Sequence, residues 1–251
     1  MARKRLRPVN PNYERIGGLS PNDPIFQEIK KTLPPHLKKA SEWAWFTSAH
    51  HIKWLVLNKS FREGITPQSR VLELGAGTGR LGDWLLKKTA LRPEGYVAVD
   101  QIYGERPEVF MKARVWKQAK RGKIRLLKGN IWKPGPIHRA LTGETFDHIL
   151  IPEGLMEPGW ERPPVELEEP RKAGRVFARI LVKKLKQGGT LRFSHAQPIF
   201  NERASRQVRE RNPFKTGFEA GLKHEMDRGH AELVERTIGG WGVSGVIIRR
   251  T

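Results

Sequence analysis

The stretch Val71–Arg80, VLELGAGTGR, is the most informative part of this sequence. Strand-forming residues run directly into three glycines at alternate positions, Gly75, Gly77 and Gly79. Glycine adopts backbone dihedrals that other residues avoid, and it has no Cβ atom to keep a ligand away from the backbone. The pattern predicts a strand, a tight turn and a helix, with a ligand held at the carboxyl edge of a parallel sheet.

Strand and helix patterns alternate after this stretch. The expected strands cover 70–74, 95–100, 123–130, 146–154 and 187–196, and the expected helices cover 81–90, about 111–119 and 171–185. In the last of these helices the apolar spacing predicts burial of Val176, Phe177, Ile180 and Leu181. Residues 231–239 and 243–250, separated by a glycine-rich turn, read as a terminal hairpin.

This order of elements predicts an α/β fold. We expect a Rossmann-like, doubly wound, seven-stranded sheet, mostly parallel with an antiparallel terminal strand, plus an N-terminal helical extension. The chain divides into a flexible basic arm (1–19), a helical extension or lid (20–64) that includes a helix at about 41–61, and the α/β domain (65–251).

The charge of the chain is strongly one-sided. Its 251 residues include 47 Lys and Arg against 26 Asp and Glu, a formal net charge of +21. A thermophilic origin is one explanation, but thermophile surfaces are enriched in both signs because ion-pair networks need partners. A one-sided excess is better explained by a polyanion, so we expect a nucleic-acid partner, RNA before DNA.

Several classes of protein are disfavoured. The chain has no cysteine, which excludes disulfides, zinc–thiolate sites and thiol nucleophiles, and we expect no metal site. No apolar run approaches the roughly 18 residues that span a bilayer, and no apolar segment follows the basic first residues. We therefore expect a cytoplasmic protein without a membrane partner, and the sequence leaves the oligomeric state open.

Polar residues near three predicted strand ends narrow the identity of the ligand. Glu73 lies inside the first strand, where a carboxylate suits a ligand that carries positive charge. Asp100 ends the second strand, about 20 residues after the turn, where it can accept both hydroxyls of a ribose. After the third strand, Asn130 can reach an adenine edge while the apolar Ile131 covers the ring. Adenine, ribose and a cationic amino-acid tail together describe S-adenosylmethionine.

With these motifs, residues 65–251 resemble the class I S-adenosylmethionine-dependent methyltransferases. The resemblance rests on ELGAGTG, on the acidic end of VAVD, on GN after the third strand, and on FDHILIPEG, LKQGGTL and the hairpin. The resemblance implies that the methionine portion of the cofactor lies against Gly75, Gly77 and Gly79, with its amino group near Glu73. It also implies that Asp100 binds the ribose, that Ile102 packs on the adenine, and that Asn130 binds the adenine edge.

The acceptor side is less clearly defined by the sequence. Amino-group nucleic-acid methyltransferases of this fold carry Asp or Asn, then Pro-Pro and an aromatic residue, where this chain has Ile151–Gly154. That departure disfavours an exocyclic amine as the acceptor. Glu153 is the catalytic candidate, able to accept a hydrogen bond from an acceptor amine or hydroxyl, or else a structural loop carboxylate. The loop containing Trp160 is a candidate clamp for the acceptor and partly resembles that of the tRNA guanine-N7 methyltransferases.

A basic segment follows the fifth predicted strand. It combines two aromatic residues, Phe214 and Phe218, with the substrate-binding candidates Arg203, Arg206, Arg209 and Arg211. Aromatic rings among arginines suit stacking on exposed bases. The alternative is that the rings anchor a surface loop.

Three functional hypotheses follow. The first is a methyltransferase that modifies nucleic acid, with RNA (tRNA or rRNA) favoured over DNA. The second is a methyltransferase for a protein or a small molecule. The third is a non-catalytic nucleic-acid-binding protein built on a methyltransferase scaffold.

Overall fold

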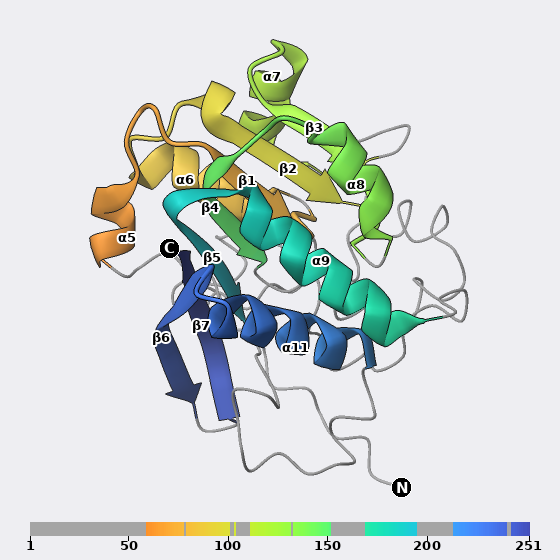
Figure 1. The fold of residues 1–251 in the computed structure, drawn as a ribbon. Helices are drawn as coiled ribbons and strands as arrows, with labels where there is room; N and C mark the ends of the chain where they lie inside the picture. The colour runs from red at the N-terminus through yellow and green to blue at the C-terminus, as the bar shows by residue number, and fades with distance from the viewer. Residues whose placement is uncertain are drawn as a thin grey trace, which may run out of the picture.

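The computed structural model of this chain describes residues 59–77, 79–100, 103, 111–131, 133–151, 169–194, 213–239 and 242–251 (Figure 1). Its strands are β1 (Val71–Leu74), β2 (Tyr96–Asp100), β3 (Arg125–Lys128), β4 (Phe146–Ile151), β5 (Leu185–Ser194), β6 (Ala231–Gly239) and β7 (Gly242–Arg250). Its α-helices are α5 (Lys59–Gly64), α6 (Arg80–Lys88), α7 (Ala113–Lys120), α8 (Pro134–Ala140), α9 (Pro170–Lys184) and α11 (Pro213–Asp227). None of the helices in these ranges has the length and apolarity that crossing a membrane requires.

The seven strands form one sheet in the order β3-β2-β1-β4-β5-β7-β6. The pairs from β3 to β5 are parallel, and β7 runs antiparallel to both β5 and β6. The short turn between β6 and β7 forces these two strands to be antiparallel. The predicted mostly parallel, seven-stranded sheet with an antiparallel terminal strand is therefore confirmed.

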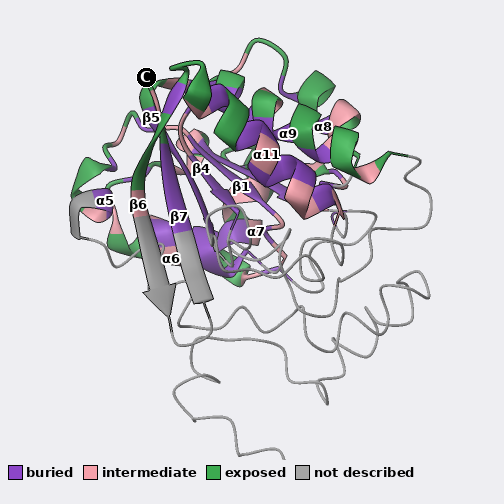
Figure 2. Ribbon diagram, turned by 60° about the horizontal axis from the view of Figure 1, so that its bottom comes forward, coloured by how far each residue is buried: buried purple, intermediate pink, exposed green. Residues whose placement is uncertain are grey.

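Helices cover both faces of the sheet (Figure 2). Successive strand residues point to opposite faces, so each face has its own apolar core. Leu72 of β1 belongs to the core under α8, α9 and α11. Its neighbour Val71 belongs to the core under α5, α6 and α7, which also contains Phe61. The result is a three-layer α/β/α arrangement, as the alternation of elements predicts.

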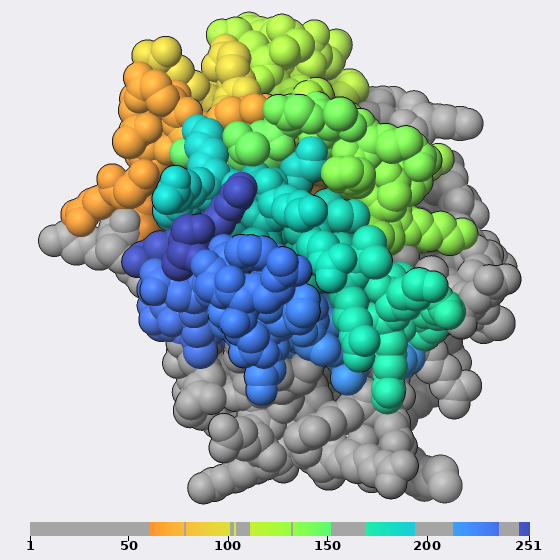
Figure 3. All heavy atoms as spheres, viewed as in Figure 1, coloured from red at the N-terminus to blue at the C-terminus, as the bar shows by residue number. Residues whose placement is uncertain are grey.

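Helices α9 and α11 lie side by side on one face (Figure 3) and approach each other closely through glycines. A Cβ added at Gly174 of α9 would lie 2.7 Å from the backbone nitrogen of Phe218, and one at Gly221 of α11 would lie 2.8 Å from the Cβ of Ala178. The atoms in the way are backbone atoms and a Cβ, which cannot swing aside as the end of a flexible side chain can. Glycine is therefore required for this helix contact.

Stacking of Phe214 and Phe218 on exposed bases is excluded, because both rings are fully buried in the core. They are anchors, as the alternative predicts, but they anchor the helix α11 and not a surface loop.

The predicted burial within α9 is confirmed for Phe177 and Leu181 and wrong for Val176, which is 44% exposed. Ile180 is only partly buried. The face of α9 that contacts α11 carries small residues instead, Gly174 and Ala178.

We expect Gly174→Ala to lower the free energy of unfolding by about 1–3 kcal/mol, the usual cost of overpacking a tight contact. Gly64→Ala is the matched control, because Gly64 is also helical, lies exposed at the end of α5, and has no atom beyond its chain neighbours and its own helix backbone within 4 Å of its Cβ position among the described residues. The control should change the free energy of unfolding by less than about 1 kcal/mol. Urea denaturation of both variants measures the difference, and equal effects would contradict the close packing.

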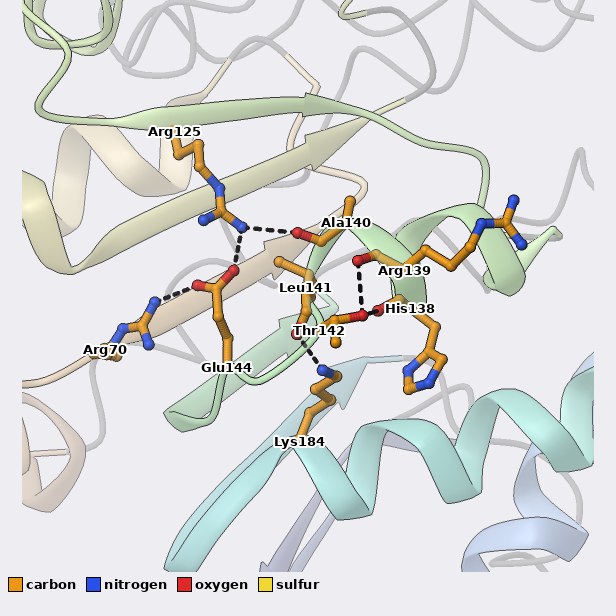
Figure 4. A network of polar contacts seen from close by, with 9 residues as sticks. All are labelled: Arg70, Arg125, His138, Arg139, Ala140, Leu141, Thr142, Glu144 and Lys184. Atoms are coloured by element: carbon orange, nitrogen blue, oxygen red, sulfur yellow. Dashed lines mark hydrogen bonds and ion pairs between the residues drawn. The ribbon is translucent and has the colours of Figure 1, made fainter.

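Charged side chains hold the amino edge of the sheet together (Figure 4). Glu144, just before β4, forms ion pairs with Arg70, which precedes β1, and with Arg125 of β3 at 2.5 Å. The Lys184 ammonium group donates to the carbonyl oxygen of Leu141 nearby. Residues from distant parts of the sequence are thus joined at the edge opposite the glycine turn.

Candidate functional site

The glycine turn after β1 has the backbone conformation that its sequence predicts. Gly75, Gly77 and Gly79 have φ angles of 72°, 51° and 74°, in the left-handed region that side chains rarely tolerate. Gly79 also begins α6, and a Cβ there would contact Val115 of α7 at 3.4 Å. The predicted strand, turn and helix are therefore confirmed.

Hydrogen bonds fasten this turn to the end of β2. The N–H groups of Gly75 and Ala76 donate to the carbonyl oxygen of Val99, at 2.9 and 3.2 Å. The N–H of Gly77 donates to Oδ2 of Asp100, at 2.8 Å. The Asp100 carbonyl oxygen accepts from the N–H of Gly129, after β3, at 3.1 Å. The structure thus brings three of the sequence signals together at the carboxyl edge of the sheet.

The turn leaves space beside its backbone. Apart from Gly77 itself and its chain neighbours, no atom of the described residues lies within 4 Å of the position that a Cβ would take at Gly77. A ligand at this position can approach the main chain closely, which is what the sequence pattern predicts. The two outer glycines serve the bend itself and, at Gly79, the contact with α7.

Glu73 lies beneath the turn and is only 1% exposed. Its carboxyl group accepts hydrogen bonds from the hydroxyl of Tyr96 and from the backbone of Gly82, in the first turn of α6. Burial raises the pKa of Glu73 to about 8, and the nearby charge of Asp100 acts in the same direction. Glu73 is therefore mostly protonated at pH 7, and a cationic ligand group beside it would lower the pKa.

Two tyrosines in this region were missed by the sequence analysis. Tyr96 fits over Gly82 so closely that a Cβ there would lie 2.6 Å from the ring Cε1. Tyr103 is buried, its N–H donates to the carbonyl oxygen of Asp100 at 3.4 Å, and burial keeps the pKa of its hydroxyl well above 10. The glycine inside the α6 pattern was the one available signal for Tyr96. Nothing in the sequence around Tyr103 indicated its position.

The residues expected beside the adenine are also at this edge. Asn130 is partly buried, and its backbone carbonyl oxygen accepts from the backbone N–H of Lys133 at 2.9 Å. Ile131 is 8% exposed and packs in the core that includes Ile137 of α8. Adenine binding by Asn130 and Ile131 stays a prediction.

The other candidates lie outside the described residues. They are the basic arm 1–19, the extension up to residue 58, Ile102, Glu153, Trp160, Arg203, Arg206, Arg209 and Arg211. Their proposed roles in cofactor binding, catalysis and substrate binding remain predictions. Of the extension, the described part begins at α5, whose Phe61 is 2% exposed and packs with α6.

The strand order and the antiparallel β7 define the class I methyltransferase fold, a Rossmann-like sheet with a glycine turn at its ligand-binding edge. No protein-family model and no curated protein matches the sequence. Solved structures are similar in fold.

An O-methyltransferase from Bacillus cereus in complex with SAH has 14% identity and a TM-score of 0.51, with 96% of this chain and 97% of that chain covered. DesVI from Streptomyces venezuelae has 11% identity and a TM-score of 0.51, with 87% of this chain and 100% of that chain covered. Cofactor-bound Rv0187 from MTB has 14% identity and a TM-score of 0.50, with 89% of this chain and 94% of that chain covered.

Proposed function

We propose that this chain is an S-adenosylmethionine-dependent methyltransferase. The observation that carries the proposal is the hydrogen bond from the Gly77 N–H to the carboxyl group of Asp100, at 2.8 Å. It places an open glycine backbone beside a strand-end carboxylate, at the edge where ligands of open α/β sheets bind. The SAH bound to the similar Bacillus cereus protein supports the same class of ligand.

The residues at this edge suit the chemical groups of the cofactor. The backbone at Gly75 and Gly77 would hold the methionine portion, Asp100 the ribose hydroxyls and Asn130 the adenine edge. Charge-assisted hydrogen bonds from hydroxyls to a carboxylate are among the stronger ones in proteins. The space beside Gly77, free of atoms from the described residues, fits a ligand that touches the main chain.

The bound cofactor supplies an electrophilic methyl group on a sulfonium. The contribution of the protein is to orient the acceptor about 3 Å from that methyl group and to keep water away. A general base is needed only for an acceptor that holds its proton tightly, and Glu153 is our candidate for that role.

Two classes of acceptor have support from different observations. A hydroxyl on a small molecule or a protein is supported by the similar structure named as an O-methyltransferase. A nucleic acid is supported by the net charge of +21. The comparisons favour the first class, since none of the three similar structures described above is named as acting on nucleic acid.

Incubation with methyl-labelled S-adenosylmethionine separates these acceptors. Total RNA, protein and a small-molecule extract are offered in parallel, and mass spectrometry follows the label into nucleosides, peptides or metabolites. Calorimetry with the cofactor tests the hypothesis of a non-catalytic nucleic-acid-binding protein. No binding at millimolar S-adenosylmethionine would exclude both methyltransferase hypotheses.

We expect Gly77→Ala to weaken cofactor binding by about tenfold, because the added Cβ enters the space of the ligand. Gly122→Ala is the matched control: its φ is also positive, at 67°, and its Cβ position is equally open, but it follows α7 at the opposite edge. Both variants should lose similar stability, of the order of 1 kcal/mol. Equal cofactor affinity in the two variants, measured by calorimetry, would place the ligand elsewhere.

A further inference from the structure

The exposed face of α9 carries a regular row of positive charge. The helix has six basic residues and no acidic ones in the sequence PRKAGRVFARILVKK. Four of them recur at every fourth position and are exposed: Arg171, Arg175, Arg179 and Lys183, called here the α9 ladder. Residues four apart are neighbours on a helix surface, each turned about 40° from the last, so the ladder is a slanting row about 18 Å long along the helix axis.

Mutual repulsion within the α9 ladder destabilises the helix. Each pair of like charges four residues apart costs an isolated helix about 0.2–0.5 kcal/mol. The helix dipole opposes the cation at Arg171 in the first turn, although it favours the one at Lys183 in the last turn. Arg179 is partly compensated by Glu225 of α11, at 3.4 Å. Among the described residues, no carboxylate forms an ion pair with Arg171, Arg175 or Lys183. Three of the four ladder charges thus have no ion-pair partner among the described residues, which favours a function outside the helix.

The ladder borders a hollow of about 300 Å³ between α9 and α11, lined by Arg175, Arg179, Ala220, Gly221, His224 and Glu225. Glu225 is 3% exposed and already paired with Arg179 and His230, so it adds little negative charge at the surface. Lys223 of α11 and Arg228 just after the helix are exposed and add two positive charges, against one negative charge from the exposed Asp227. The two helices form a continuous part of the face shown in Figure 3.

The ladder runs across the molecule from one edge of the sheet to the other. Lys184 at the end of α9 leads directly into β5, which starts at the amino edge, so Lys183 lies near that edge. The start of α9 lies toward the carboxyl edge, where the candidate cofactor site is found (Figure 1), and Arg171 is in its first turn. A polyanion lying along the ladder would therefore extend toward the candidate site.

We propose that the α9 ladder and the adjoining surface of α11 bind the phosphate backbone of a nucleic acid. A row of about 18 Å matches roughly five phosphates at a rise of 3.4 Å per nucleotide. Arginine suits this role because its planar guanidinium can bind two phosphate oxygens at once. The surface is distinct from the expected cluster Arg203–Arg211. It goes beyond the proposed function, since backbone binding on this face does not require methyl transfer.

The test removes three ladder charges in the full-length protein, in the variant R171Q/R175Q/K183Q. Arg179 is kept because it pairs with the buried Glu225. The matched control, K88Q/R92Q/R121Q, removes the same charge from exposed positions on other elements. Binding of a 20-nucleotide RNA of mixed sequence is measured over a series of salt concentrations. We expect about tenfold weaker binding by the ladder variant, with the slope of log K against log salt smaller by about 2–3, and less than a twofold change in the control.

Three results would overturn the proposal. If RNA binding is weakened equally in the two variants, only the net charge of the protein matters. If the ladder variant binds RNA as tightly as the wild type, this surface does not bind nucleic acid. Polyglutamate that competes as well as RNA at equal charge would indicate an acidic protein as the partner. Weaker binding of DNA of the same sequence in the ladder variant would support the proposal for both nucleic acids.

Two further measurements keep these results interpretable. Thermal unfolding of the ladder variant should show no loss of stability, because mutually repelling charges have been removed. Calorimetry with S-adenosylmethionine should give the same affinity for the ladder variant and the wild type. Failure of cofactor binding in all proteins would count against the proposed function and leave the phosphate-binding surface unaffected.

Discussion

Replacing Asp100 with alanine is expected to weaken S-adenosylmethionine binding by about 10- to 100-fold, equivalent to about 1.4–3 kcal/mol. The substitution removes the carboxylate assigned to the ribose hydroxyls. It also removes the acceptor for the Gly77 N–H, which holds the glycine turn against β2. Both losses act on the same ligand, so calorimetry should show a lower affinity.

Two companion variants separate these effects. Asp100→Asn keeps an oxygen that can accept from Gly77 but loses the charge, so its affinity should fall between those of the wild type and Asp100→Ala. Asp147→Ala removes a carboxylate that also accepts from a backbone N–H, that of Arg70 at 2.7 Å, but lies at the amino edge. It should lower stability and leave cofactor affinity unchanged. Wild-type affinity in Asp100→Ala would show that the ribose is held elsewhere.

Glu73→Gln is expected to change how stability depends on pH. The pKa of Glu73 is raised by burial from its ordinary value of 4.5 to about 8, so between these values the folded protein holds a proton that the unfolded chain releases. The stabilisation from this proton is fully present below pH 4.5 and is lost as the pH rises toward 8. The loss is about 1.4 kcal/mol per pH unit and at most about 5 kcal/mol in total. The glutamine variant should lack this decline.

The comparison is cleanest between pH 6.5 and 8. Burial lowers the pKa of His148 from 6.5 to about 4, and this acts in the opposite direction, since stability then rises with pH between 4 and 6.5. Subtracting the denaturation curves of Glu73→Gln from those of the wild type removes that contribution. Parallel curves for the two proteins above pH 6.5 would mean that Glu73 is already ionised in the folded state.

Tyr96→Phe provides a second check on Glu73. The hydroxyl of Tyr96 donates to the carboxyl group and lowers its pKa, so its removal should extend the decline in stability to higher pH. An unchanged profile in this variant would show that the hydrogen bond does not affect the ionised form.

Secondary structure and turns are predicted correctly where the residues of a short segment determine its conformation by themselves. The succession of strands and helices along the chain, the glycine turn and the terminal hairpin all follow from residue types at fixed spacing. The burial of Phe214 and Phe218 could not be read in this way. Rings beside arginines look the same in sequence whether they face solvent or the core, and the answer depends on how closely α9 approaches α11.

The sequence by itself determined the α/β class, the glycine turn and the acid at the end of β2, because backbone sterics and the periodicity of side chains act over a few residues. Only the tertiary structure decided that Glu73 is a buried acid under α6, hydrogen-bonded to Tyr96, and that four basic residues of α9 form an exposed row beside α11. These properties depend on contacts between segments far apart in the chain. Such contacts set burial, and burial sets both the pKa of a carboxyl group and the surface that a partner can reach.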